Sequence, residues 1–288
     1  MARPVKPDSV PAIEARGVHL AFDGRAVLNG VDLKIMPGER MVILGSSGGG
    51  KTTLLRVMLG VYQPDAGGVL AFGRDISRMD EAELNAMRRR WGVLFQGGAL
   101  YNSMTVGENV ALPLREHTRL DDPIIAVMVR MKLDLVGMRD FEDLKPAQLS
   151  GGMAKRVGLA RAIALDPEIL FFDEPTTGLD PITSGAIMSL INDLVRKSGA
   201  TSVIVTQDMR CAFTCADRIA LLFGGRVAAL GAPEEMRSSA DPLVRQFING
   251  EPDGPIPLRL SRRDYLEELL RVRAGPAGKA PDPPGGAS

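Results

Sequence analysis

The stretch at residues 41–53, MVILGSSGGGKTT, contains the motif that decides the fold of this chain. Residues 41–44 are apolar and predict a short buried strand, which leads directly into a glycine-rich turn and then into helix-forming residues. Glycines let backbone N–H groups turn inward around an anion, and the following helix presents its own free N–H groups to it. The pattern predicts a phosphate-binding loop; the alternative is a chance glycine-rich turn.

In a loop of this kind, each residue type has a defined task. Lys51 reaches the terminal phosphates of a nucleotide, and the Thr52 hydroxyl ligates magnesium. The other residues that we expect to contact the nucleotide lie in the loop and at the helix start: Gly45, Ser46, Ser47, Gly48, Gly49, Gly50 and Thr53.

Composition describes an ordinary globular chain: 288 residues with 45% hydrophobic content suffice for one large or two modest domains. The 35 basic and 35 acidic residues give a net charge of zero, which argues against nucleic acid as a partner. The longest apolar runs, such as 169–172 and 219–223, fall far short of the roughly 20 residues that span a bilayer. The first residues lack the apolar core of a secretory signal, so we expect a reducing cytoplasm, with Cys211 and Cys215 as packing thiols on a helix.

The chain begins with strand patterns and then changes to helices. Residues 13–22 and 26–35 alternate apolar and polar side chains, and the Asp23-Gly24 pair between them predicts an antiparallel hairpin. From residue 97 to about residue 149 the pattern is helical only, which we interpret as an inserted helical subdomain.

Two further patterns belong to this part of the chain. Thr105 and Glu108 form a capping box, which marks a helix start. An earlier expected helix ends in Arg88, Arg89 and Arg90, which we interpret as a solvated helix end, with a binding patch as the alternative.

Strand patterns return at residues 169–172, 201–206 and 219–223, separated by helical stretches. This alternation predicts right-handed crossovers and a parallel sheet. The first of these strands, ILFF, delivers Asp173 and Glu174 at its carboxyl end, where open parallel sheets bind ligands. Asp173 is then a magnesium partner and Glu174 a general base for the attacking water. The alternative is a strand followed by a polar turn.

A second candidate anion site lies just upstream in LSGGM, residues 149–153. Ser150 can cap the helix that follows, while Gly151 and Gly152 allow an anion to approach the backbone closely. One nucleotide does not need two such helix starts from one chain, so the duplication favours a symmetric dimer in which the Ser150 loop closes over phosphates held by Lys51 of the other chain. The alternative is an ordinary N-capped glycine turn.

The ordered set GSSGGGKT, Gln96, LSGGM, ILFFDEP and Gly178-Leu179-Asp180 resembles the ATP-binding subunit of ABC transporters over about residues 13–240. The resemblance implies an α/β P-loop NTPase fold of ABC type, which has a mainly parallel sheet core, an N-terminal antiparallel β subdomain and an inserted α-helical subdomain. It implies ATP hydrolysis with ATP and Mg2+ as cofactors. It also implies that Gln96 senses magnesium and water, that Asp180 communicates between protomers, and that Phe22 stacks on adenine. The alternative for Phe22 is a core aromatic at the end of a strand.

Residue 207 departs from the family pattern. Members of the family usually carry a histidine after the strand at 201–206, where it contacts the terminal phosphate, whereas this chain has Gln207. An amide donates a neutral hydrogen bond but carries no positive charge and exchanges no proton. We therefore expect ATP binding to persist with slower turnover.

Two stretches that hydrolysis does not need carry a narrower resemblance. Residues 95–118 and the C-terminal residues 241–257 are similar to the ATPase of Mla and Mce-type bacterial lipid transporters. This implies a homodimer that drives two permease subunits joined to periplasmic MCE-type lipid-binding subunits, with a small cytoplasmic STAS-like regulatory subunit. The location implied is the cytoplasmic face of the inner membrane, as a peripheral protein. The alternatives are an importer of another cargo and a soluble ABC ATPase outside transport.

The expected division of the chain follows from these patterns and the resemblance together. It comprises a disordered N-terminus (1–12), the ATPase core (13–96 and 155–240), the helical subdomain with the signature motif (97–154), a C-terminal extension (241–274) and a disordered tail (275–288).

Overall fold

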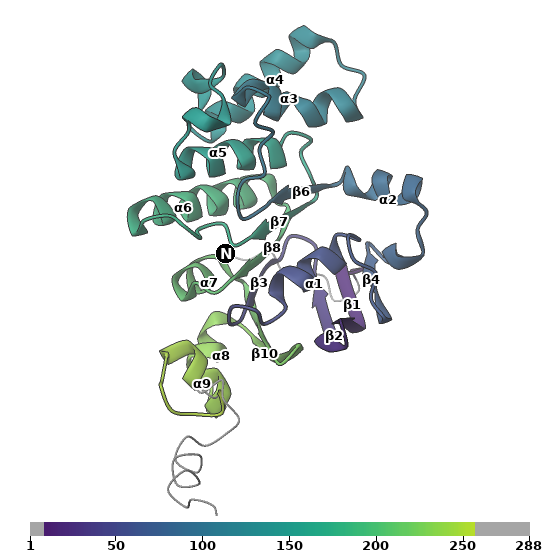
Figure 1. The fold of residues 1–288 in the computed structure, drawn as a ribbon, viewed down its shortest axis with the longest axis vertical. Helices are drawn as coiled ribbons and strands as arrows, with labels where there is room; N and C mark the ends of the chain where they lie inside the picture. Colours follow the sequence, from purple (N-terminus) through teal and green to yellow (C-terminus); the bar gives the residue numbers. More distant parts are fainter. Residues whose placement is uncertain (1–8, 257–288) are drawn as a thin grey trace, which may run out of the picture. The chain divides into compact units, whose positions relative to one another are not determined.

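The structure, a computed structural model, describes residues 9–256. Its contacts divide the chain into two units, Met1–Ser239 and Ala240–Ser288, which are treated separately below (Figure 1). Residues 1–8 of the N-terminus expected to be disordered (1–12), and the whole expected disordered tail (275–288), lie outside the described residues. The domain boundaries expected from the sequence stay a prediction.

An antiparallel sheet forms the N-terminal part of the first unit. Its strands, in the spatial order β2-β1-β4-β5, are β1 (Ile13–Phe22), β2 (Arg25–Ile35), β4 (Ala66–Ala71) and β5 (Arg74–Asp75). Asp23 and Gly24 adopt positive φ angles of 50° and 75°, which the tight turn between β1 and β2 requires. The predicted hairpin is confirmed.

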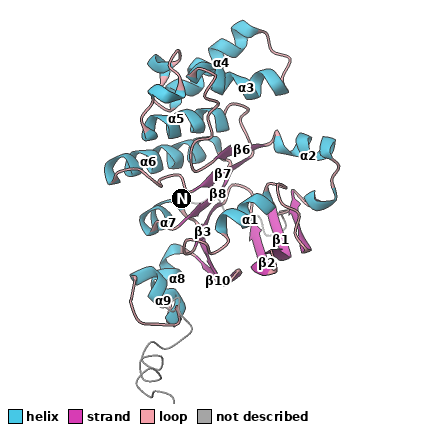
Figure 2. Cartoon of the chain, in the orientation of Figure 1, coloured by secondary structure: helices cyan, strands magenta, loops and turns pink. Residues whose placement is uncertain are grey.

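A second, mainly parallel sheet forms the centre of this unit (Figure 2). Its strands, in the spatial order β10-β9-β3-β8-β7-β6, are β3 (Arg40–Leu44), β6 (Trp91–Leu94), β7 (Ile169–Asp173), β8 (Thr201–Thr206), β9 (Arg218–Phe223) and β10 (Arg226–Gly231). Only the edge pair β9 and β10 is antiparallel among these six strands. Strands β7 and β8 are buried along their whole length, as expected for a parallel sheet covered on both faces.

Helices surround this sheet, and three of them, α3, α4 and α5, follow β6 and precede β7 as one helical segment (Figure 1). The helices of the first unit are α1 (Lys51–Met58), α2 (Glu81–Arg88), α3 (Val106–His117), α4 (Asp122–Leu135), α5 (Gly151–Ala162), α6 (Pro181–Ser198), α7 (Met209–Cys215) and α8 (Pro233–Arg237), with 3₁₀ turns at Ile76–Arg78, Arg139–Phe141 and Pro146–Gln148. The predicted capping box is confirmed, because Thr105 and Glu108 bond each other's backbone N–H groups at the start of α3.

One apolar core joins the two sheets. Ile13 and Val31 of the antiparallel sheet belong to the same buried cluster as Met41, Phe171 and Val203 of the parallel sheet. The cluster fixes the antiparallel hairpin against β3, the strand that leads into the glycine-rich loop.

The arginine run at the end of α2 differs from the prediction. Arg88 donates to the carbonyl of Gly60 at 3.0 Å, and Arg90 forms an ion pair with Glu168 at 2.6 Å. The side chains of Arg88 and Arg90 thus connect the end of α2 to neighbouring segments. The prediction of a solvated helix end is therefore wrong for these two residues. Cys211 and Cys215 are both free and buried on α7, which confirms their predicted packing role.

The second unit contains α9 (Pro242–Asn249). Asp241 caps its N-terminus, and Gly250 ends it with a φ of 66°. The Gln246 side chain exchanges two hydrogen bonds with the backbone of Ile256, which closes the segment that follows the helix.

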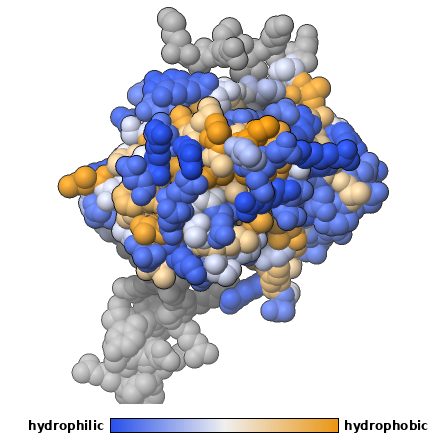
Figure 3. Space-filling model, turned by 90° about the horizontal axis from the view of Figure 1, so that it is seen from above, coloured by the Kyte–Doolittle hydropathy of each residue, from blue (hydrophilic) through white to orange (hydrophobic). Residues whose placement is uncertain are grey.

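Within residues 9–256, no helix is both long enough and apolar enough to cross a bilayer. The surface seen from above mixes hydrophilic and apolar side chains (Figure 3). Exposed apolar residues of α4, among them Val127 and Met131, are part of the apolar surface of the helical segment.

Candidate active site

The glycine-rich loop links β3 to α1 and depends on glycine at several positions. Gly48 and Gly50 adopt φ angles of 73° and 91°, a region that favours glycine. A Cβ atom on Gly45 would lie 2.6 Å from the carbonyl oxygen of Leu222, and one on Gly50 would lie 2.9 Å from that of Val27. The loop therefore sits too close to its neighbours for side chains at these positions.

Lys51, the first residue of α1, folds back under the loop. Its Nζ donates to the carbonyls of Gly45 and Ser46 at 3.1 and 3.0 Å, and the side chain is only 5% exposed. It also lies 3.4 Å from Glu174 Oε1. A buried ammonium held this way is placed to meet an anion seated in the loop.

Thr52 and Asp173 meet at the carboxyl end of the parallel sheet. The Thr52 hydroxyl donates to Asp173 Oδ1 at 2.9 Å. Burial raises the pKa of Asp173 above its ordinary value, although the Thr52 hydrogen bond opposes this shift. A hydroxyl and a carboxylate side by side are hard oxygen ligands, so this pair fits Mg2+, whose charge would favour the ionised carboxylate.

Glu174 follows Asp173 with a strained backbone, at a φ of 46°. Its Oε2 accepts hydrogen bonds from Thr177 at 3.2 Å and from Thr206 at 3.4 Å. Sequence reasoning missed both threonines. The parallel register of β7 with β8, which pairs Asp173 with Val205, puts Thr206 beside Glu174 and is the signal that identifies it.

Glu174 and Gln207 line one cavity of about 840 Å³ between the ends of β7 and β8 and helices α6 and α7. Gln207 itself is exposed. It follows β8 directly and precedes Asp208, which caps α7. The structure thus brings these two predicted catalytic residues to the same space.

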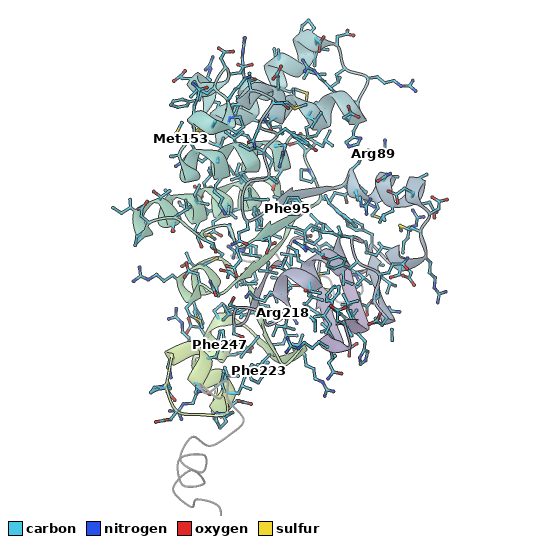
Figure 4. All side chains as sticks on the ribbon, viewed as in Figure 1. Arg89, Phe95, Met153, Arg218, Phe223 and Phe247 are labelled. Atoms are coloured by element: carbon cyan, nitrogen blue, oxygen red, sulfur yellow. The ribbon has the colours of Figure 1, made fainter. Side chains whose placement is uncertain are left out.

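The Ser150 loop lies apart from the glycine-rich loop. Ser150 caps α5 by accepting from the backbone N–H of Met153 at 3.3 Å. Figures 1 and 4 show α5, with labelled Met153 in its first turn, separated from α1 by strands of the central sheet. Within one chain, the structure therefore does not bring Ser150, Gly151 and Gly152 together with Lys51.

Asp180 is a neighbour of the Ser150 loop. Its carboxylate caps α6 by accepting from the N–H groups of Ile182 and Thr183, both at 3.0 Å, and hydrogen bonds from Thr183 lower its pKa. A Cβ atom on Gly152 would lie 2.6 Å from Thr183 Cγ2, so the start of α5 packs closely on the start of α6.

Phe22, at the end of β1, is 42% exposed, so the alternative of a core aromatic is wrong. Its ring packs edge-on against Tyr62, with the centroids 5.5 Å apart. Arg56 donates to the Tyr62 hydroxyl at 2.9 Å, so Tyr62 is held from α1. Sequence reasoning did not single out Tyr62.

Gln96 follows β6, and its side chain is exposed. Its carbonyl accepts a hydrogen bond from Lys155, a buried lysine of α5 that sequence reasoning did not identify. No local pattern marks Lys155, because the carbonyl that it meets belongs to a residue 59 positions away in the chain.

A glycine-rich phosphate loop, an acidic pair at the end of a parallel strand and a second helix start set apart in a helical segment define a nucleotide-hydrolysing cassette. A sequence profile described as ABC transporter matches residues 28–177. The chain belongs to the ABC transporter family, as an ATP-binding ATPase, and the predicted fold class is confirmed.

Curated relatives include the "Intermembrane phospholipid transport system ATP-binding protein MlaF" of Escherichia coli K12, which is 42% identical over 258 residues, covering 90% of this chain and 96% of the relative. The protein of the same name from Haemophilus influenzae is also 42% identical, and the match covers 90% of this chain and 98% of the relative. The "Probable ribonucleotide transport ATP-binding protein mkl" of Mycobacterium tuberculosis H37Rv is 41% identical, and the match covers 92% of this chain and 74% of the relative.

Among solved structures, the dimeric bacterial ABC transporter cassette MJ0796 is 33% identical to this chain, with a TM-score of 0.71. The match covers 77% of this chain and 98% of the solved chain. A dimeric post-hydrolysis state of the same cassette, bound to ADP and Pi, matches with the same TM-score.

Proposed function

We propose that this chain is the ATPase subunit of a bacterial transporter that moves phospholipid or another lipid across or between the envelope membranes. The observation that carries this proposal is the near full-length similarity to MlaF, which includes the C-terminal residues 241–250 that hydrolysis does not need. The chain works as a homodimer on the cytoplasmic face of the inner membrane, as a peripheral protein.

The nucleotide is held mainly by the loop that precedes α1. The buried Lys51 ammonium and the close backbone approaches at Gly45 and Gly50 support an anion seat there, with Phe22 and Tyr62 on the side of the base. Thr52, Asp173 and Gln96 provide oxygen ligands for Mg2+. When bound, Mg-ATP supplies the phosphoanhydride bond that is cleaved.

Glu174 is the general base. Thr177 and Thr206 hold its Oε2. This leaves Oε1, which is 3.4 Å from Lys51 Nζ, to take a proton from the attacking water. Gln207 offers only a neutral hydrogen bond at the position where the family usually has histidine, which makes turnover slow.

The second half of each site comes from the other chain. Ser150, Gly151 and Gly152 form an N-terminal anion seat that is too far from Lys51 of the same chain, and the cassettes of known structure are described as dimers. Asp180 lies beside this seat and connects the two chains.

The permease contact is a groove of about 500 Å³ beside the helical segment. Its lining includes Arg89, Phe95, Tyr101 and Pro113, so it follows the segment that leaves the active site after Gln96. Two permease subunits dock there, and they are joined to periplasmic MCE-type lipid-binding subunits. A small STAS-like subunit regulates the complex, and no nucleic acid takes part.

Detergent extraction and affinity purification of the full chain test this proposal. We expect a polytopic membrane protein in the purified complex, and ATP hydrolysis that rises when the complex is reconstituted in phospholipid vesicles. The matched control is Glu174→Gln, which should purify with the same partners but hydrolyse ATP at least about 100-fold more slowly. A pool without a membrane partner, associated with RNA or DNA, would contradict the proposal.

A second cargo class is supported by one observation: the mycobacterial relative of nearly equal identity is named for ribonucleotide transport. Cargo is selected by subunits other than this chain. Transport assays with the complete complex distinguish the two cargo classes. Lipid exchange between vesicles supports lipid as the cargo, and uptake of labelled ribonucleotide supports ribonucleotide.

A further inference from the structure

Lys155 is a buried lysine in the second turn of α5, with 5% of its surface exposed. Its Nζ donates to two backbone carbonyls, that of Gln96 and that of Glu174, the latter at 3.2 Å. Glu174 directly follows β7, and Gln96 lies two positions after the end of the neighbouring parallel strand β6. One ammonium group therefore links α5 to both chain segments that carry the magnesium sensor and the general base.

This arrangement is costly as a purely structural device. Among the described residues, Lys155 forms no salt bridge, and burial lowers its pKa while the charges of Asp173 and Glu174 oppose that shift. A buried charge without a close counter-ion destabilises a fold relative to an apolar side chain of similar volume. Lys132 of α4 provides a contrast, because this other buried lysine is paired with Asp166.

Helix α5 belongs to both nucleotide sites of the proposed dimer. Its first residues, after the cap Ser150, face the nucleotide bound to the partner chain. Lys155, five positions after Ser150, holds Gln96 and Glu174. These two residues act on the nucleotide bound to the same chain as this Lys155. A helix moves as a rigid element, so a displacement at Ser150 reaches these two carbonyls directly.

We propose that Lys155 is a positioning residue that couples the two nucleotide sites: when the Ser150 loop engages the nucleotide of the partner chain, Lys155 sets Gln96 and Glu174 for hydrolysis in its own chain. The inference rests on the dimeric function proposed above. It assigns to Lys155 no contact with the nucleotide.

Mixed dimers of two differently tagged full-length chains test this coupling. One chain carries Glu174→Gln, so that hydrolysis occurs in one site only. Lys155→Met is then introduced either into the chain with the intact Glu174 (cis) or into the chain with Glu174→Gln (trans). The readout is ADP formed at the intact site in a single turnover, with ATP binding measured in parallel.

We expect the cis arrangement to lower the single-turnover rate about tenfold or more and the trans arrangement to change it by less than about twofold, at similar ATP affinity. Lys155→Arg in cis should restore most of the rate, because it keeps the donors. Lys132→Met in cis serves as the matched loss of a buried lysine and should leave the rate within about twofold. Both arrangements contain Lys155→Met once, and the parallel ATP-binding measurement identifies any local loss of fold in the chain with the intact Glu174.

An equal loss in both arrangements, a larger loss in trans, or no loss in cis would overturn the inference while leaving the proposed dimer intact. A larger loss in trans would mean that Lys155 only supports the Ser150 loop. A reference mixed dimer that binds ATP but forms no ADP would instead refute the two-site function, and the inference with it.

Discussion

Among single residues, Glu174 is the one to which we assign the role of general base, and its setting fits that proposal. A positive φ of 46° turns the carboxylate away from the direction of the strand, and two threonine hydroxyls hold one of its oxygens. Such a conformation persists only where surrounding contacts hold it in place. The backbone N–H of Glu174, which donates to the carbonyl of Val205 at 2.9 Å, is one of these contacts.

Glu174→Gln is expected to reduce the rate of ATP hydrolysis about 10²- to 10⁴-fold, because the amide cannot take a proton from water. Nucleotide binding should persist, since Lys51 keeps both loop carbonyl contacts. Phosphate release and binding of a fluorescent ATP analogue measure the two effects. Glu168→Gln removes a carboxylate paired with Arg90 instead and should retain the rate. Comparable hydrolysis by Glu174→Gln would remove Glu174 from the role of base.

Gln207→His is expected to raise the turnover number several-fold, because an imidazole can carry a positive charge and exchange a proton beside Glu174 in the shared cavity. Gln207→Asn keeps a neutral amide and serves as the control without gain. Steady-state phosphate release at saturating ATP compares the three proteins. Equal rates for the histidine variant and the unchanged chain would show that the residue type at position 207 does not limit turnover.

At the scale of elements, close approach of helix and strand restricts side-chain size. A Cβ atom on Gly92 of β6 would lie 2.1 Å from the carbonyl oxygen of Ala162, the last residue of α5. By contrast, a Cβ atom on Gly185 of α6 would meet nothing within 4 Å. The two glycines therefore have different reasons to be present.

Gly92→Ala should lower the free energy of unfolding by about 1–3 kcal/mol, because a backbone atom must move to make room. Gly185→Ala should raise it by about 0.5–1 kcal/mol, because alanine is the better helix former and the site is open. Urea unfolding of the nucleotide-free chain measures both. A Gly92→Ala protein as stable as the unchanged chain would mean that α5 and β6 are less closely packed than described.

A charge cluster on the antiparallel sheet makes its stability depend on pH. The carboxylate of Glu14 pairs with Arg16 at 2.7 Å and with Lys34 at 3.2 Å. The hydrogen bond from Arg16, followed by that from Lys34, lowers the pKa of Glu14 below its ordinary value of 4.5, although burial opposes the shift. A lowered carboxyl pKa stabilises the fold above the unfolded value and loses that effect as the pH falls through the folded value.

Glu14→Gln should therefore lower the melting temperature at about pH 7, and the difference from the unchanged chain should shrink as the pH falls below about 4. Thermal unfolding followed at several pH values measures this. Asp65→Asn, which changes a carboxylate just before β4 that accepts from the backbone N–H of Ala21 but forms no ion pair among the described residues, controls for general charge effects. A difference that stays constant down to low pH would mean that the Glu14 effect is steric rather than ionic.

For the whole molecule, the groove beside the helical segment is the surface where we propose that the membrane partner docks. Arg89 and Phe95, both labelled in Figure 4, line it. Glu108 on the nearby α3 is outside this lining, and its carboxylate accepts from the backbone N–H of Thr105 in the α3 cap. Reversing its charge would weaken the helix as well as any docking surface.

Arg89→Glu should reduce lipid transport and recovery of the permease about tenfold, because it reverses a charge in the groove, while ATP binding by the isolated chain stays within about twofold. Arg78→Glu reverses a highly exposed charge outside the groove lining and should retain transport. Co-purification and vesicle lipid exchange measure the outcome. Equal loss of ATP binding and transport would assign Arg89 to the fold and not to docking.

The features of this protein that could be predicted from its residues alone are local. The glycine-rich loop, the caps at Ser150 and Thr105, and the Asp23-Gly24 hairpin are each formed by residues close in the chain, so steric and hydrogen-bonding preferences suffice to predict them. Alternation of strands and helices was likewise enough for the parallel sheet, whereas the ABC-type fold class came from the resemblance to a known family.

Contacts between segments that are distant in the chain could be found only in the folded structure. Lys155 meets Gln96, 59 residues away, and Thr206 meets Glu174 across 32 residues, because the strand register and the packing of α5 bring them together. The same packing gives Arg90 its partner Glu168 and exposes Phe22 beside Tyr62. Local preferences extend over a few residues only, whereas these contacts depend on how the whole apolar core positions the ends of its strands.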